Sequence, residues 1–218
     1  MPDLVVYGAS GFGQQVMFWV EDADAAQPRF RILGFVDDDS GAHGDQRTSY
    51  PVLGGREWLE ERASSEPVAV VLGLARPEIK RRIATALAGL AAVEFPAIVH
   101  PSAVVSRHAT VGRGATVGPG NVASVNVEIG EFATVNTACT LGHDARIGAY
   151  ATVLPGVNVS GHVSVGESVS LGTGAAITQG VTIGPGATVG AGATVLDDLP
   201  EGCVAVGTPA RPRPRDGL

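Results

Sequence analysis

Histidines in the second half of the chain are candidates for proton transfer, and one of them has an acid beside it. His143 is followed directly by Asp144, while His162 lies further along the chain and His108 precedes all three. An imidazole exchanges protons near neutral pH, and a neighbouring carboxylate orients the ring and raises its basicity. His143 with Asp144 is therefore the first candidate for a general base, and His162 with Asp144 is the rival pair.

A glycine-rich loop near the N-terminus is a candidate for ligand binding. Gly8, Gly11 and Gly13 follow the apolar run Leu4–Tyr7. Such a loop lets backbone N–H groups approach a phosphate or a sugar at the start of a helix. The spacing is G-x-x-G-x-G, which differs from the dinucleotide fingerprint G-x-G-x-x-G, so a dinucleotide is not indicated.

Two acids and another glycine end later apolar runs. Asp37 and Asp38 follow Ile32–Val36, and Gly73 follows Val68–Leu72. In a parallel sheet these positions share the carboxyl edge, where ligands bind, and an acid there can accept hydrogen bonds from hydroxyl groups or pair with an amine.

A small parallel sheet is needed to bring these loops to one edge. Residues 1–95 show the matching pattern, in which predicted strands alternate with predicted helices. The sequence predicts strands over Leu4–Tyr7, Ile32–Val36 and Val68–Leu72, and helices over Gly13–Asp22, Arg56–Ala63 and Pro77–Ala88. Alternation of strands and helices is typical of a parallel sheet with helices on its faces.

The histidines belong to a different pattern, which has a period of six. Every sixth residue from 105 to 195 is Val, Ile or Leu except Ala123, and the series two residues earlier is small and apolar except Asn121. Apolar residues two apart lie on one face of a strand. A six-residue unit of this kind must stack on others, as in a β-helix.

Three such units make one coil with three sides, and the coils stack about 4.8 Å apart through strand hydrogen bonds. Asp144 and His162 are separated by three units, so His162 is expected directly above that acid on the next coil. The same count places His108 three coils before His162, or about 14 Å away.

The glycine that often follows the large aliphatic residue is expected to turn the chain through a positive φ. Asn136 occupies one such position, and asparagine tolerates the left-handed conformation. Cys139 lies in the inward series of small residues, so we interpret it as part of the core rather than as a nucleophile.

Composition excludes several classes of protein. The chain has 218 residues, 44% hydrophobic and 5% aromatic, with a formal net charge of −7. The negative charge argues against a nucleic-acid partner. No signal peptide, membrane span, disulfide framework or zinc knuckle is indicated, so we expect a cytoplasmic protein without a metal cofactor.

Four motifs carry a resemblance that extends over nearly the whole chain. They are VVYGASGFG at residues 5–13, FVDD at 35–38, LGHDARIG at 141–148 and VGTPA at 206–210. The repeat resembles the left-handed parallel β-helix of hexapeptide acyltransferases. The chain as a whole resembles two-domain sugar acetyltransferases, which include the sialic acid O-acetyltransferase type and the nucleotide-linked amino-sugar N-acetyltransferases. The expected fold is an α/β Rossmann-like domain over residues 1–98, followed by a left-handed β-helix with a C-terminal tail over residues 99–218.

The resemblance implies roles for particular residues. Those implied to hold the nucleotide-sugar are Ser10, Gly11, Phe12, Asp37, Asp38 and Gly73; those implied to contact coenzyme A are Thr152, Thr173 and Ala191. His143 takes the place of the catalytic base, with Asp144 as its helper. Arg146 and the tail residues Arg211, Arg213 and Arg215 are candidates for the phosphates of the coenzyme. The family also implies a homotrimer whose coenzyme groove lies between neighbouring subunits.

The function expected from this resemblance is acetyl-CoA-dependent N-acetylation of a nucleotide-linked amino sugar, by direct transfer. O-acetylation of a sialic acid or another sugar hydroxyl is the alternative within the same fold. A zinc enzyme of the β-helix carbonic anhydrase type needs three convergent histidines, and the spacing of His108 from the others disfavours it. A non-catalytic β-solenoid that only binds a partner is the remaining alternative.

Overall fold

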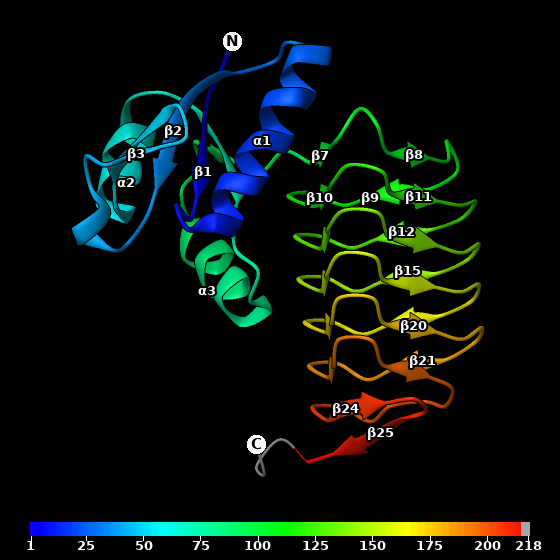
Figure 1. The fold of residues 1–218 in the computed structure, drawn as a ribbon. Coiled ribbons are helices and arrows are strands. Elements are labelled where there is room, and N and C mark those ends of the chain that lie inside the picture. The colour runs from blue at the N-terminus through cyan, green and yellow to red at the C-terminus, as the bar shows by residue number, and fades with distance from the viewer. Residues whose placement is uncertain (215–218) are drawn as a thin grey trace. The chain divides into compact units, whose positions relative to one another are not determined.

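The computed structural model describes residues 1–214, and the chain divides into two compact units. The first comprises Met1–Ala75 and Ile79–Pro101, and the second comprises Arg76–Glu78 and the chain from Ser102 onward. Figure 1 shows the helices in the first unit and the stacked coils of the second. Across residues 1–214, no helix combines the length and the hydropathy needed to cross a bilayer.

The first unit is a six-stranded sheet with strand order β3-β4-β2-β1-β5-β6. Its strands are β1 (Asp3–Tyr7), β2 (Arg31–Val36), β3 (Gln46–Arg47), β4 (Tyr50–Gly54), β5 (Val68–Leu72) and β6 (Val93–Glu94). Its helices are α1 (Gly11–Ala26), α2 (Arg56–Ser65) and α3 (Pro77–Leu87), with a short 3₁₀ turn at Ser40–Ala42. All neighbouring strands are parallel except β3 and β4, which form a hairpin. The predicted Rossmann-like sheet is confirmed, and β3, β4 and β6 are additions to it.

Burial explains why these segments form strands and a helix. Every residue of β1 and β5 is buried, as is usual for parallel strands covered on both faces. Helix α1 contributes an apolar stripe at helical spacing: Val16, Trp19, Val20 and Ala23. This stripe belongs to the same core cluster as Leu4 of β1 and Val71 of β5.

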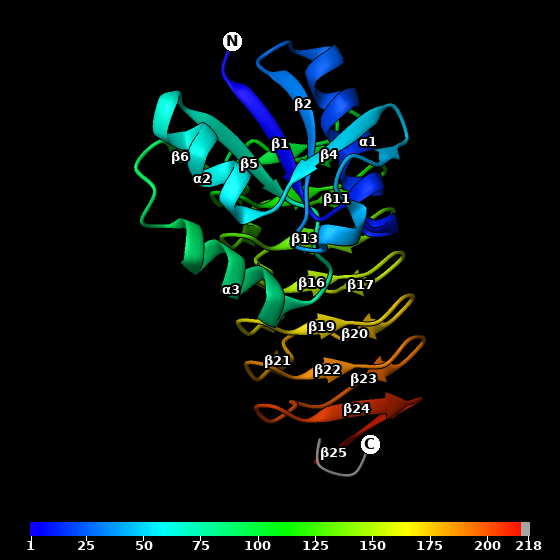
Figure 2. The same ribbon diagram turned by 90° about the vertical axis from the view of Figure 1, so that its left-hand side faces the viewer.

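The second unit is a parallel β-helix with three faces. Within the second unit, face A consists of β10 (Thr116–Val117), β13 (Thr134–Val135), β16 (Thr152–Val153), β19 (Ser170–Leu171), β22 (Thr188–Val189), β24 (Val204–Gly207) and β25 (Ala210–Arg213). Strand β25 is antiparallel to β24, and the other strands of this face are parallel. Face B consists of β8 (Val104–Val105), β11 (Val122–Ala123), β14 (Thr140–Leu141), β17 (Asn158–Val159), β20 (Ala176–Ile177) and β23 (Thr194–Val195). Face C consists of β9 (Thr110–Val111), β12 (Glu128–Ile129), β15 (Arg146–Ile147), β18 (Ser164–Val165) and β21 (Thr182–Ile183). The strands of face A lie one below another in Figure 2.

The register of these faces confirms the predicted coil of three six-residue units. Thr116 pairs with Thr134, and Thr134 pairs with Thr152. Both predicted series point inward: Val135 and Leu171 of the aliphatic series and Ala133 of the small series are fully buried. Cys139 is fully buried as well, as its position in the small series predicts.

The predicted place of the positive φ is wrong by two positions. The glycine after the aliphatic residue, such as Gly148, does not have a positive φ; the left-handed residue of that six-residue unit is Tyr150, with φ of 61°. Position 148 favours glycine for another reason, because a Cβ there would lie 2.5 Å from the carbonyl carbon of Gly166 on the next coil. Asn136 is likewise not left-handed. It is buried, and its Oδ1 accepts a hydrogen bond from the backbone N–H of Thr137 at 2.7 Å.

Candidate active site

The corner between faces B and C carries the predicted catalytic pair. Asn126, Asp144 and His162 occupy this corner on three successive coils, all left-handed, with φ of 58°, 60° and 58°. His143 precedes Asp144 and lies two residues after the end of β14, and its carbonyl oxygen accepts a hydrogen bond from the backbone N–H of His162 at 2.9 Å. The rungs of the β-helix therefore fix the backbone of all four residues. We call this position the B–C corner.

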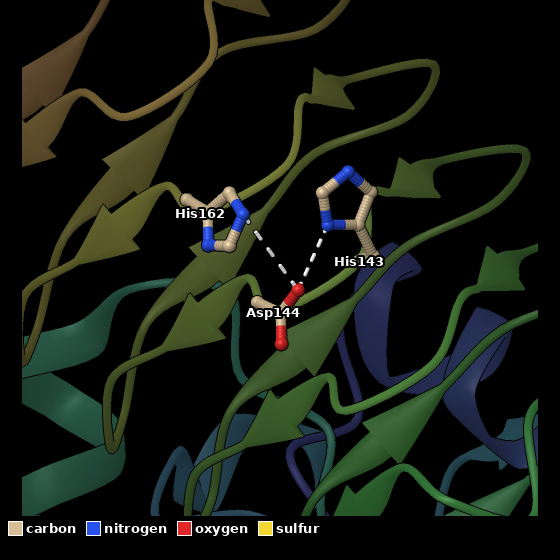
Figure 3. A group of neighbouring side chains, drawn as sticks. All are labelled: His143, Asp144 and His162. Atoms are coloured by element: carbon tan, nitrogen blue, oxygen red, sulfur yellow. Dashed lines mark hydrogen bonds and ion pairs between the residues drawn. The ribbon is translucent and has the colours of Figure 1, made fainter.

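Both imidazole rings face one oxygen of the Asp144 carboxylate (Figure 3). His143 Nδ1 is 2.8 Å from Asp144 Oδ2, whereas His162 Nε2 is 3.8 Å from the same oxygen. The two rings meet edge to face, with centroids 4.9 Å apart and an angle of 86°. The predicted stacking of His162 over Asp144 is confirmed, and the hydrogen bond is made by His143.

A second partner holds Asp144 in place. Asn126 Nδ2 donates to Asp144 Oδ1 at 3.0 Å. The hydrogen bond from His143, and then that from Asn126, lowers the pKa of the Asp144 carboxyl below its ordinary value. An ionised carboxylate only accepts hydrogen bonds, so His143 must donate through Nδ1–H. The lone pair of the neutral ring is then at Nε2, the nitrogen suited to accept a proton from a substrate.

Gly161 leaves the space that the His143 ring occupies. A Cβ at residue 161 would lie 2.7 Å from His143 Nε2 and 2.8 Å from its Cε1. Gly161 lies directly on the coil after His143, beside His162. Sequence reasoning did not identify this glycine, although its offset of one coil from the histidine was visible in the repeat.

His108 remains apart from this group. It occupies the same corner two coils before Asp144, and its Nε2 accepts a hydrogen bond from Arg107 Nε at 3.2 Å. Among residues 1–214, the group that brings possible metal ligands together consists of His143, Asp144 and His162.

The residues implied to contact coenzyme A lie in two places. Thr173 and Ala191 are exposed and occupy the corner between faces A and B on successive coils. Thr152 belongs to face A and is only 2% exposed. Face B separates the A–B corner from the corner that holds His143 within one protomer.

The arginines predicted to contact the coenzyme phosphates lie on different parts of the second unit. Arg146 is on face C, with its Nε 3.5 Å from Glu128 Oε1. Arg211 Nη1 is 3.8 Å from Asp197 Oδ2, and Arg213 ends β25. Arg215 lies outside the described residues.

At the carboxyl edge of the first unit, three glycines allow close backbone packing. Gly8 follows β1 with φ of 111°. A Cβ at Gly13 would overlap the carbonyl oxygen of Gly8, and one at Gly73 would lie 2.7 Å from Gly13 Cα. These contacts bring the first turn of α1 against the ends of β1 and β5. Gly73 is thus a packing position as well as a predicted binding position.

The two acids at this edge are held by hydrogen bonds from the loop and from β1. Asp37 Oδ2 accepts from the backbone N–H of Ala9 at 2.7 Å, and Asp38 Oδ1 accepts from the Tyr7 hydroxyl at 2.6 Å. Burial, and then the bond to Asp38, raises the pKa of Tyr7, so the phenol stays protonated and donates. Sequence reasoning missed Tyr7, because it is the last residue of a buried strand and carries no motif of its own.

The remaining predicted binding residues lie at the start of α1. Ser10 and Gly11 are exposed. Within the described residues, the Ser10 side chain makes no capping hydrogen bond to the helix. Phe12 packs against the core cluster and meets Trp19 edge to face, with ring centroids 6.3 Å apart. The Phe12 ring is therefore part of the packing, and its backbone belongs to the loop.

Both halves of the chain are similar to known protein families. The chain matches the model of the PglD N-terminal domain over residues 3–87 and that of the bacterial transferase hexapeptide (six repeats) over residues 162–197. It is 33% identical to the acetyltransferase domain of PglB from Neisseria gonorrhoeae FA1090, with a TM-score of 0.89, over 98% of this chain and 100% of that one. The chain belongs to the hexapeptide-repeat sugar acetyltransferases. The β-helix is accordingly the left-handed parallel type of that family.

Two other solved structures are similar to this chain over nearly its whole length. WeeI from Acinetobacter baumannii AYE is 30% identical, with a TM-score of 0.87, over 98% of this chain and 100% of that one. PerB from Caulobacter crescentus, solved in complex with CoA and GDP-perosamine, is 28% identical with a TM-score of 0.89 over 98% of both chains. A comparison with curated proteins found no match.

Proposed function

We propose that the protein is an acetyl-CoA-dependent N-acetyltransferase that acts on a nucleotide-linked amino sugar, with His143 as the general base. The observation that carries this proposal is the hydrogen bond of 2.8 Å between His143 Nδ1 and Asp144. It leaves Nε2 of a half-exposed ring as the proton acceptor.

The relatives support the substrates. The acetyltransferase domain of PglB was solved in complex with acetyl coenzyme A. PerB was solved with CoA and GDP-perosamine, and two further structures with both ligands are of variants in which a histidine is replaced by asparagine or by alanine. An acetyl thioester and a nucleotide-linked amino sugar are therefore the substrates to test first.

The proposed reaction transfers the acetyl group in one displacement. The unprotonated amine attacks the thioester carbonyl, and a C–N bond forms as the proton on nitrogen passes to Nε2 of His143. Asp144 stabilises the imidazolium through Nδ1–H. The C–S bond then breaks, and the coenzyme thiolate leaves and takes up the proton, which returns the imidazole to its neutral form.

The two cysteines support direct transfer rather than an acetyl-enzyme. Cys139 and Cys203 are both buried. Burial raises the pKa of the Cys139 thiol, which keeps it protonated and unreactive. Neither sulfur is placed to accept an acetyl group from a coenzyme on the outer surface.

We assign the nucleotide-sugar to the proposed Rossmann-like domain of residues 1–98. Ser10 and Gly11 offer a hydroxyl and an N–H group at the start of the long helix α1, a position that favours a phosphate. Asp37 and Asp38 lie at the same edge and are fixed by Ala9 and Tyr7. With Phe12 and Gly73 they complete the proposed binding loop.

Coenzyme A is assigned to the proposed β-helix domain of residues 99–218, and in this proposal the site requires a neighbouring subunit. Thr173 and Ala191 share the A–B corner, whereas His143 lies across face B. Face B also exposes Val104 and Val122, 65% and 46% accessible, which is favourable for association. We therefore propose a homotrimer in which the coenzyme lies between the A–B corner of one subunit and the B–C corner of the next. The buried side chain of Thr152 lies at neither corner, so we leave it out of this site.

An acceptor screen tests this function. The full chain is incubated with acetyl-CoA and nucleotide-sugars that carry either an amine or a hydroxyl at the acceptor carbon, and released thiol is measured. Acetylation of an amino sugar supports the proposal, whereas turnover restricted to hydroxyl acceptors supports O-acetylation. Binding of CoA by calorimetry separates both from a non-catalytic β-solenoid, which would not bind it.

A further inference from the structure

The side chains at the B–C corner have the composition of a transition-metal site. His143, Asp144 and His162 each offer one ligand atom within 4.8 Å of the other two. Imidazole nitrogen and carboxylate oxygen are ligands that Zn²⁺ accepts at about 2.0–2.2 Å, which places tetrahedral donor atoms about 3.3–3.6 Å apart. Asp144 Oδ2 lies 2.8 Å from His143 Nδ1 and 3.8 Å from His162 Nε2, one distance below that range and one above it.

The backbone holds these ligands together while the side chains can adjust. His143 and Asp144 are consecutive, and the N–H of His162 donates to the carbonyl of His143 at 2.9 Å. The three side chains are 50%, 37% and 55% exposed, so small rotations disturb no core packing. Figure 3 shows a nitrogen of each ring facing the same carboxylate oxygen. Small rotations of the side chains would bring all three donors to one ion.

We infer that His143, Asp144 and His162 form a binding site for a divalent transition ion of the Zn²⁺ type, and that the bound ion inhibits acetyl transfer. The inhibition rests on the proposed role of His143 as base. A neutral imidazole has one lone pair on nitrogen. Coordination through Nδ1 moves the ring proton to Nε2, and coordination through Nε2 uses the catalytic lone pair itself. Either geometry leaves no acceptor for the proton of the attacking amine.

Binding is tested on the full chain without substrates. Zn²⁺ is titrated calorimetrically in a buffer that does not chelate metals, and Co²⁺ is added separately to read the visible absorption of a four-coordinate site. We expect one ion per chain. His162→Asn should weaken binding by more than about tenfold, the least expected when a metal loses even an outer partner. His108→Asn is the matched control, since it removes a histidine of the same corner that lies outside the group.

Inhibition is tested by the formation of N-acetyl product with and without Zn²⁺, because zinc binds thiolates and would disturb a thiol assay. The wild type and His108→Asn should lose activity on addition of Zn²⁺. His162→Asn should need a Zn²⁺ concentration more than about tenfold higher for the same loss of activity. No saturable binding by the wild type, or equal binding by His162→Asn, overturns the site. Binding with undiminished transfer overturns the inhibition and the assignment of the base, while the calorimetry still establishes the site.

Discussion

Replacement of Gly161 by alanine tests whether the observed position of the His143 ring is the catalytic one. A Cβ at residue 161 would lie 2.7 Å from His143 Nε2, and ordinary contact begins at 3.4 Å. The ring must therefore move by about 0.7 Å, away from the backbone that fixes its present place. Since a displacement of about 1 Å costs on the order of 100-fold in rate, Gly161→Ala should lower kcat by between about 10- and 100-fold.

The same substitution should leave the fold intact. Gly161 does not have a positive φ, and the atoms nearest to its added Cβ belong to the His143 side chain. The melting temperature should match that of Gly89→Ala, a substitution at a glycine with open space around it. In a His143→Ala background, Gly161→Ala should have no further effect on kcat. Unchanged kcat in the single variant, or an equal loss in both backgrounds, would refute the reasoning.

Three further predictions follow from other contacts. Asp144→Asn removes the charge that would stabilise the imidazolium, so kcat should fall by about 100-fold or more at neutral pH, and an unchanged kcat contradicts the pairing. Tyr7→Phe frees Asp38 from its hydrogen bond of 2.6 Å, so KM for the nucleotide-sugar should rise by about tenfold with kcat nearly unchanged, whereas a pure loss of kcat would exclude a role in binding. Leu171→Ala opens a cavity at a fully buried position and should lower the free energy of unfolding by about 2–5 kcal/mol in denaturant titrations. Glu61→Ala, on an exposed residue of α2 outside the proposed interface, should change it by less than about 0.5 kcal/mol.

The pH range over which Asp144 acts follows from the direction of its shift. Its pKa is lowered in the folded chain, so the stabilising contribution of the carboxylate is present above the ordinary pKa of an aspartate. That contribution is lost as the pH falls through the lowered value. The Asp144 carboxylate is therefore charged throughout the neutral pH range.

The period of six determined most of what the sequence predicts about the second unit. Because each coil consists of three six-residue units, the offset between Asp144 and His162 placed them on adjacent rungs, and the structure confirms this at 3.8 Å. The position of the left-handed residue was wrong because a recurring glycine has two possible causes. At Gly148 the cause is close approach of the next coil, and the positive φ belongs to Tyr150.

The features that sequence reasoning missed depend on contacts between distant segments. The Tyr7 hydroxyl at the end of β1 donates a hydrogen bond to Asp38, which follows the neighbouring strand β2. The strand Tyr50–Gly54 contains Pro51, which argues against a strand when the sequence is read alone. It forms nonetheless, because it pairs with β2 and with the hairpin strand β3.

The central claim is that the imidazole of His143 takes the proton from the acceptor amine, and single-turnover kinetics of His143→Ala test it most directly. With saturating acetyl-CoA and the best amino-sugar nucleotide from the screen, the rate of N-acetyl product formation should fall by about 10²–10⁴-fold. Calorimetry should show that CoA still binds with wild-type affinity. Product formation at the wild-type rate would contradict the account.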